Sequence, residues 1–339
     1  MPHLSPWQYL FGSGDDQSLI TATGLDHQAF SEMHALFQPL YDNYVISRTG
    51  TIQTRKKKGG RKRLLDSYAC MGLTLMWTRT RGAEWILSCQ FGITGTPISV
   101  WVRFGMRMLV HILKQLPDSY VRLPTAEKVQ EYKDAITSKY SLLQDCYCVA
   151  DGLKIYLQQA GEFMVQNKFY NGWKCDHYVN NVFAFAPDGT IIAAVVNAPG
   201  CMHDSQIADF GYLYDKLQII WEQSRGRCVM DSAFCKSRFE YIVKSSQELP
   251  LNASIREHQI NTQATSVRQS AEWGMRAFQG SFPRIKDRMI YEERGERKLI
   301  LKFVVLLYNY RARKVRLNQI LNTYMPELSK DYLYRENIT

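Results

Sequence analysis

The sequence has 339 residues, of which 45% are hydrophobic and 22% charged, a composition that excludes global disorder and suits two domains or one large one. No run approaches 18 consecutive apolar residues, so no membrane association is expected. Lysine and arginine outnumber aspartate and glutamate by 42 to 32, and the net charge of +10 favours a polyanionic partner such as nucleic acid. A basic protein without such a partner is an equal alternative.

A strongly basic segment lies in the N-terminal part of the chain. The sequence RKKKGGRKR, residues 55–63, has seven basic residues in nine, and its two central glycines make it flexible. It predicts either a nuclear-import signal, and with it a nuclear location, or an arm that contacts nucleic-acid phosphates. A solvated linker is the alternative.

Three helices are expected after this segment, over residues 64–80, 83–91 and 97–113. Gly92 stands where the second helix needs a left-handed residue to end, and a short turn leads into the third helix. This order is typical of a helix-turn-helix module, whose last helix enters the DNA groove. Arg103 and Arg107 lie on one face of that helix and are candidate DNA contacts. A three-helix packing unit without DNA contact is the alternative.

From about residue 145 the pattern predicts a mixed sheet covered by helices. Strands are expected at 146–157, in a hairpin over 181–200, at 227–231 and at 249–255, and helices at 203–223, 264–282 and 297–324. Three strands in a meander followed by alternating helices and strands fit a ribonuclease-H-like fold. The predicted fold class is therefore α/β, a ribonuclease-H-like mixed sheet flanked by helices and preceded by an all-α helix-turn-helix region.

Three acidic residues stand out in these elements. Asp151 lies among apolar residues of the first strand, where a charge needs a partner or a metal ion, although Asp-Gly is also a turn dipeptide. Asp231 ends a buried strand, where ligands of open sheets bind, although an N-cap role is equally compatible. Glu272 borders the buried stripe of the helix at 264–282. Its alternative is a surface ion pair with Arg268 or Arg276.

The segments around these acids resemble the PIF/Harbinger superfamily of DDE transposases and its DDE superfamily endonuclease relatives. The resembling stretches are VADGLKIYL, NAPGCMHDSQI, VMDSAF and VRQSAEWGMRAFQGSFPRIK, and the resemblance covers roughly 140–312. Met230 and Phe234 stand where the family usually has glycine and tyrosine. Neither position carries the family's chemistry.

The resemblance implies a metal-binding catalytic triad of Asp151, Asp231 and Glu272 that holds two Mg²⁺ or Mn²⁺ ions. These ions would activate water to cut DNA at the ends of a mobile element, and the freed 3′-hydroxyl would attack target DNA. His203 and Asp204 would stand behind the triad as supporting residues. The basic residues expected to contact DNA phosphates are Arg268, Arg276, Arg284 and Lys286.

The resemblance also suggests a Myb-like partner protein that assists DNA binding and nuclear entry, so that without it the chain would be cytoplasmic. A homodimer is the default expectation for the assembly. The expected domains are a helical N-terminal region at 1–120, a ribonuclease-H-like DDE domain at 140–312, and a helix end and tail at 313–339. Two alternatives to an active nuclease stay open: a domesticated DNA- or protein-binding protein on the same fold, and an unrelated basic α/β protein whose acids lie far apart.

Overall fold

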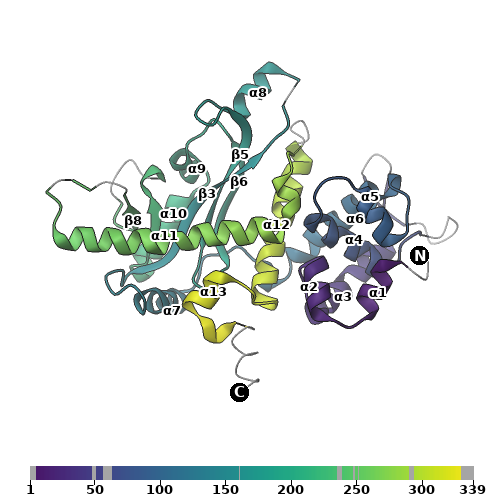
Figure 1. The fold of residues 1–339 in the computed structure, drawn as a ribbon, viewed down its shortest axis with the longest axis horizontal. Coiled ribbons are helices and arrows are strands. Elements are labelled where there is room, and N and C mark those ends of the chain that lie inside the picture. Colours follow the sequence, from purple (N-terminus) through teal and green to yellow (C-terminus); the bar gives the residue numbers. More distant parts are fainter. Residues whose placement is uncertain are drawn as a thin grey trace. The chain divides into compact units, whose positions relative to one another are not determined.

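The computed structural model describes residues 5–47, 51–55, 63–159, 161–234, 239–246, 249–250, 252–289 and 294–329. Residues 56–62 of the basic segment lie outside this part of the chain, and so does the prediction made on them. The chain divides into two compact units (Figure 1). The first unit comprises Met1–Tyr120, Gly280–Asp287 and Leu299–Val315, and the second comprises Val121–Gln279, Arg288–Lys298 and Arg316–Thr339. No helix of the described residues is long and apolar enough to cross a membrane.

The described residues of the first unit are helical apart from one short β-ribbon. Its helices are α1 (Pro6–Gly12), α2 (Asp16–Thr23), α3 (His27–Asn43), α4 (Ser67–Arg79), α5 (Trp85–Phe91), α6 (Thr96–Leu113) and most of α12 (Arg294–Lys314), with short 3₁₀ turns η1 (Pro117–Ser119) and η3 (Pro283–Lys286). The ribbon pairs β1 (Tyr44–Ile46) with β2 (Ile52–Thr54). The ribbon lies before the segment for which the helix-turn-helix was expected.

The three helices expected over 64–113 are confirmed as α4, α5 and α6. Helix α4 begins after Asp66, whose side chain accepts a 2.7 Å hydrogen bond from the amide of Ala69. Gly92 ends α5 in the left-handed conformation, with φ of 62°. Helices α4 and α6 pack closely because Gly105 has no side chain: a Cβ there would lie 1.9 Å from the hydroxyl of Thr74.

The second unit is built on a mixed sheet. Its strands are β3 (Cys146–Tyr156), β4 (Tyr170–Asn171), β5 (Asp176–Phe185), β6 (Ile191–Pro199), β7 (Arg227–Asp231) and β8 (Ile242–Ser245). The main strands are ordered β6-β5-β3-β7-β8, and β4 extends the pairing at the start of β5. Strands β3, β5 and β6 pair antiparallel, whereas β7 and β8 add on in parallel. This is the ribonuclease-H-like fold, as predicted.

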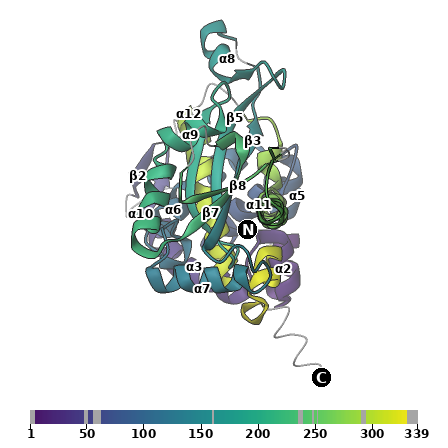
Figure 2. The same ribbon diagram turned by 90° about the vertical axis from the view of Figure 1, so that its left-hand side faces the viewer.

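Helices cover both faces of this sheet. They are α7 (Ala126–Thr137), α8 (Phe163–Phe169), α9 (Asp204–Phe210), α10 (Leu213–Ser224), α11 (Ile255–Ser281) and α13 (Gln319–Tyr324), with short 3₁₀ turns η2 (Ser232–Phe234) and η4 (Pro326–Leu328). Figure 1 shows α11 running along the sheet, and Figure 2 shows α9 and α10 on the opposite side from α11. Phe183 of β5 faces α11, where its ring lies 5.0 Å from that of Phe278.

Three expected boundaries differ from the structure. The last strand is β8, not residues 249–255, because Ser254 and Glu257 form a capping box that starts α11 at once: the Ser254 amide donates to Glu257 at 2.7 Å. The helix expected at 203–223 is divided into α9 and α10 at Tyr212, which has a positive φ of 54°. The final helix expected at 297–324 is divided into α12 and α13.

Candidate functional site

Asp151 and Asp231 lie on neighbouring parallel strands. Asp151 is in the middle of β3 and Asp231 is the last residue of β7, and the residues that precede them are register partners. Side chains at matching positions of parallel strands project from the same face, and the strands are about 4.8 Å apart. Asp151 also pairs with Phe183, which faces α11. The two aspartates therefore share the face of the sheet that α11 covers.

Glu272 approaches this face from α11 and shares a cation with Asp151. Arg268, one turn before Glu272, lies with Nη1 3.7 Å from Oδ2 of Asp151 and with Nη2 3.4 Å from Oε1 of Glu272. The stripe of apolar residues expected on this helix is buried, which fixes the orientation of the half-buried positions beside it. The arginine thus lies between two carboxylates that are 121 residues apart in the sequence.

Asp204 reaches the same end of the sheet from α9. A Cβ on Gly152 would lie 2.9–3.0 Å from the three carboxylate atoms of Asp204, so this carboxylate fits only against a residue without a side chain. Asp204 is the first residue of α9, and the N-cap position belongs to His203, whose amide donates a 3.0 Å hydrogen bond to Gln206. His203 itself is exposed.

The electrostatics of these groups reflect burial and crowding. Burial is the main cause that raises the pKa of Asp151 to about 6, and Asp204 and Asp231 raise it further. The Gly152 amide, which donates to Oδ1 of Asp151 at 2.7 Å, and Arg268 oppose this rise. Burial likewise raises the pKa of Asp204, with Asp231 adding to it. The three aspartates thus interact through their charges.

The chemistry of this donor set fits a hard divalent cation. Mg²⁺ and Mn²⁺ prefer oxygen ligands, and here Asp151 and Asp231 project toward α11, which carries Glu272, whereas Asp204 lies on the other face against Gly152. A cationic group, the Arg268 guanidinium, already lies between two of them. Among the described residues, no three histidine, cysteine, aspartate or glutamate side chains are close enough together to hold an ion as they stand. An ion would therefore require these side chains, and Arg268 with them, to rearrange.

The basic residues expected to contact DNA are distributed over both units. In the first unit, Arg103 of α6 is exposed and Arg107 is half-buried. Arg284 is engaged within that unit: its guanidinium donates to the carbonyl of Gly82 at 2.6 Å and lies 4.9 Å from the ring centroid of Trp77.

Arg284 also forms ion pairs of 3.7 Å with Glu84 and 4.0 Å with Asp287, so three kinds of contact hold it within the first unit. Lys286 is exposed. In the second unit Arg276 is exposed on α11, whereas Arg268 is half-buried between the carboxylates.

One functional feature was missed in the sequence, the role of Gly152. The Asp-Gly dipeptide was interpreted only as a competing turn, but both residues lie inside β3. A glycine inside a strand is a signal that something approaches the backbone closely. Here the approaching group is the carboxylate of Asp204.

Comparisons with known proteins find a family model that matches part of the chain. Residues 150–309 match the family model described as DDE superfamily endonuclease, in agreement with the resemblance of the motifs. No curated protein matches the sequence. Among solved structures, the "Crystal structure of a pre-cleavage Mos1 transpososome" is similar at 10% identity over 85% of this chain and 84% of that chain, with a TM-score of 0.27.

Proposed function

Because residues 150–309 match the DDE superfamily endonuclease family, we propose that this chain is a metal-dependent DNA nuclease of the transposase type, which cuts and joins DNA. Two pairwise relations among Asp151, Asp231 and Glu272 support the proposal. Two of these carboxylates share the Arg268 guanidinium, and two lie on adjacent strands. Carboxylates that lie close together repel one another, and a divalent cation between them would remove this repulsion.

Each member of the triad has a distinct structural support. Asp151 and Asp231 would hold the ions from the rigid sheet, and Glu272 would close the site from α11. When bound, two Mg²⁺ or Mn²⁺ ions supply an activated water or 3′-hydroxyl and stabilise the charge that develops on the phosphate. When DNA binds, the Arg268 guanidinium would leave Asp151 and Glu272 and bind a DNA phosphate. A guanidinium binds carboxylate and phosphate oxygens in similar ways.

Asp204 and His203 support this site from α9. Asp204 would act on the site through its charge, because it lies against Gly152, which faces the opposite side of the sheet from the Asp151 side chain. His203 would fix the start of α9 and lower the charge repulsion on Asp204, to which it is adjacent.

The remaining basic residues belong to the DNA-binding part of the proposal. Arg103 and Arg107 of the helix-turn-helix, together with Arg276 and Lys286, would contact phosphates, which positions DNA without reading its sequence. Arg284, which pairs with Glu84, would stabilise the surface beside Lys286. A nuclear location, a Myb-like partner and a homodimer complete the proposal. The partner rests on the resemblance, the location on the resemblance and the basic segment, and the homodimer on the frequency of symmetric assemblies.

A second candidate function is DNA or protein binding without cleavage. It is favoured by one observation: the Arg268 guanidinium lies between Asp151 and Glu272, so the carboxylates are neutralised by the chain itself. The fold and the basic charge serve this function equally well.

Cleavage of DNA tests the two functions against each other. The substrate is a plasmid that carries the DNA flanking the coding sequence of this chain, incubated with Mn²⁺ or with EDTA. The nuclease proposal expects metal-dependent cuts by the wild type and none by Asp151→Asn, Asp231→Asn or Glu272→Gln. Asp209→Asn, an exposed carboxylate on α9, is the matched control. Cuts that persist in Glu272→Gln would disprove the assigned triad, and tight binding without cuts would favour the second candidate.

A further inference from the structure

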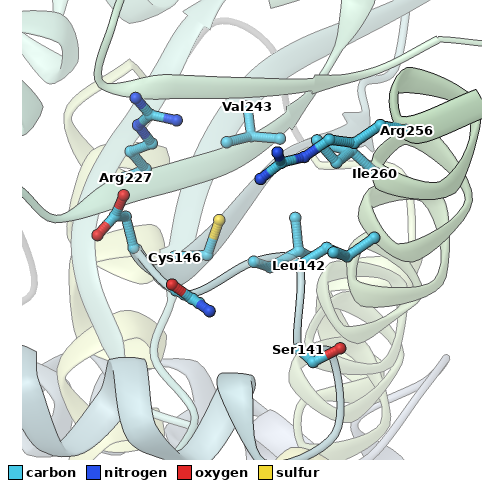
Figure 3. A pocket seen from close by; sticks show the side chains of 10 residues that line it. Ser141, Leu142, Cys146, Arg227, Val243, Arg256 and Ile260 are labelled. Atoms are coloured by element: carbon cyan, nitrogen blue, oxygen red, sulfur yellow. The ribbon is translucent and has the colours of Figure 1, made fainter. Parts of the chain in front are cut away.

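A hollow of about 240 Å³ lies where β3 and β7 begin, away from Asp151, Asp231 and Glu272 (Figure 3). Its lining comes from the segment before β3, from β7 and β8, and from the first turns of α11: Ser141, Leu142, Leu143, Gln144, Asp145, Cys146, Arg227, Val243, Arg256 and Ile260. Arg227 is four residues before Asp231 on β7, so about 13 Å of strand separates the hollow from the proposed metal site.

Arg227 is held in place, yet one of its donors is unused. Its guanidinium carbon lies 5.2 Å from the ring centroid of Trp221, a cation–π contact that restricts the side chain. Its backbone amide donates to the carbonyl of Asp145 at 2.7 Å. Within the described part of the chain, the buried Nε of Arg227 has no hydrogen-bond partner. A buried donor without a partner is costly, so the Arg227 guanidinium keeps unsatisfied hydrogen-bonding capacity beside the hollow.

A second guanidinium comes from α11. Figure 3 shows Arg256 reaching from the helix into the space above Cys146, with Arg227 on the other side of that space. Arg256 is exposed and lines the hollow from the first turn of α11. Ser141 and Gln144 add uncharged hydrogen-bonding groups to the rim.

The acidic groups of the lining do not cancel these two positive charges. Asp145 lies 3.8 Å from the ammonium of Lys133, a buried lysine, so this carboxylate has its own counter-ion. Burial raises the pKa of the Cys146 thiol to about 12, so the floor of the hollow stays uncharged at neutral pH. The hollow therefore has a net positive charge above a floor that is apolar at Cys146, Val243 and Ile260.

We propose that this hollow binds a phosphate group, carried either by a small molecule or by a DNA backbone. Two guanidinium groups from separate elements, those of Arg227 and Arg256, match the several acceptor oxygens of a phosphate. The volume is below the range of about 300–1,000 Å³ that is usual for drug-sized ligands, so the occupant is a single small group. This site is independent of the proposed nuclease activity.

Calorimetric titration in EDTA tests the proposal on the full chain, with inorganic phosphate, adenosine monophosphate and a short DNA duplex as separate probes. Saturable phosphate binding that weakens about tenfold or more in Arg256→Gln and in Arg227→Gln is the expected result. Arg225→Gln is the matched control, since Arg225 contacts the same tryptophan at 5.0 Å but is not part of the lining.

The titration with duplex DNA distinguishes a DNA backbone from a small molecule as the carrier of the bound phosphate. Displacement of bound phosphate by duplex DNA identifies a backbone phosphate as the ligand, and displacement by adenosine monophosphate alone identifies a small molecule. Thermal unfolding confirms that each variant folds, and the exposed Arg256 makes its variant the safer of the two. Absence of saturable phosphate binding, or equal binding by wild type and Arg256→Gln, overturns the proposal.

Discussion

Replacing Asp151 by asparagine is expected to stabilise the metal-free protein at neutral pH. The folded protein raises the pKa of Asp151 from its usual 3.8 to about 6. A carboxyl with a raised pKa contributes stability that is present below its unfolded pKa and lost as pH rises through its folded pKa. The ionised group is therefore a cost above pH 6, which asparagine avoids while its side-chain oxygen can still accept from the Gly152 amide.

The size of this effect follows from the pKa difference. A difference of about 2.2 corresponds to about 3 kcal/mol, an upper limit because the Asp151 side chain is 22% exposed. For a domain of this size, about 3 kcal/mol raises the unfolding temperature by about 6–12 °C. The measurement is thermal unfolding of wild type and Asp151→Asn in EDTA between pH 4 and pH 8.

The pH dependence distinguishes this cause from others. The advantage of Asp151→Asn should be largest above pH 7 and should become small near pH 4, where the folded carboxyl is protonated and the unfolded one, with its usual pKa of 3.8, is partly protonated. The control Asp209→Asn removes an exposed carboxylate of the same unit and should show no such trend. An unfolding temperature that is unchanged or lower at pH 7.5 would refute the reasoning.

Three further changes test other parts of the structure. Arg268→Gln removes the cation between two carboxylates, so Mn²⁺ binding measured by electron paramagnetic resonance should tighten severalfold; unchanged affinity would show that the arginine does not compete with the ion. Gly152→Ala places a Cβ within 3.0 Å of the Asp204 carboxylate and should lower the free energy of unfolding by about 1–3 kcal/mol, measured in urea, with Gly161→Ala, where space is open, as the control. Charge reversal at Arg103 and Arg107 should weaken DNA binding and lower its salt slope by about 0.9 per lost phosphate contact, and an unchanged slope would exclude a phosphate-contacting role.

The sheet could be predicted from the sequence because its strands have distinct patterns. The run from Cys146 to Ala150 is fully buried, as expected of a central strand covered on both faces, and the Pro-Asp-Gly turn marks the hairpin of β5 and β6. Strand β8 was missed because it is short and half-buried, whereas a more apolar segment follows it. The capping box at Ser254 was an available signal that this following segment leads into a helix.

The candidate site could be predicted only in part. The residue types and their elements were visible in the sequence, since Asp231 ends a strand and Glu272 borders a buried stripe. The shared guanidinium was not, because pairing of Arg268 with Asp151 depends on how α11 lies over the sheet. Helical spacing alone predicts the pair with Glu272.

Helix α11 connects the hollow to the carboxylates at the other end of the second unit. Arg256 at its start lines the hollow, and Glu272, sixteen residues later, faces the carboxylates, so one rod about 24 Å long joins the two. The buried residues along its length leave such a rod little freedom to bend, but a rod can slide or turn as a whole. A displacement of the whole helix would therefore move Arg256 and Glu272 together, whereas a local change at the hollow would leave Glu272 in place.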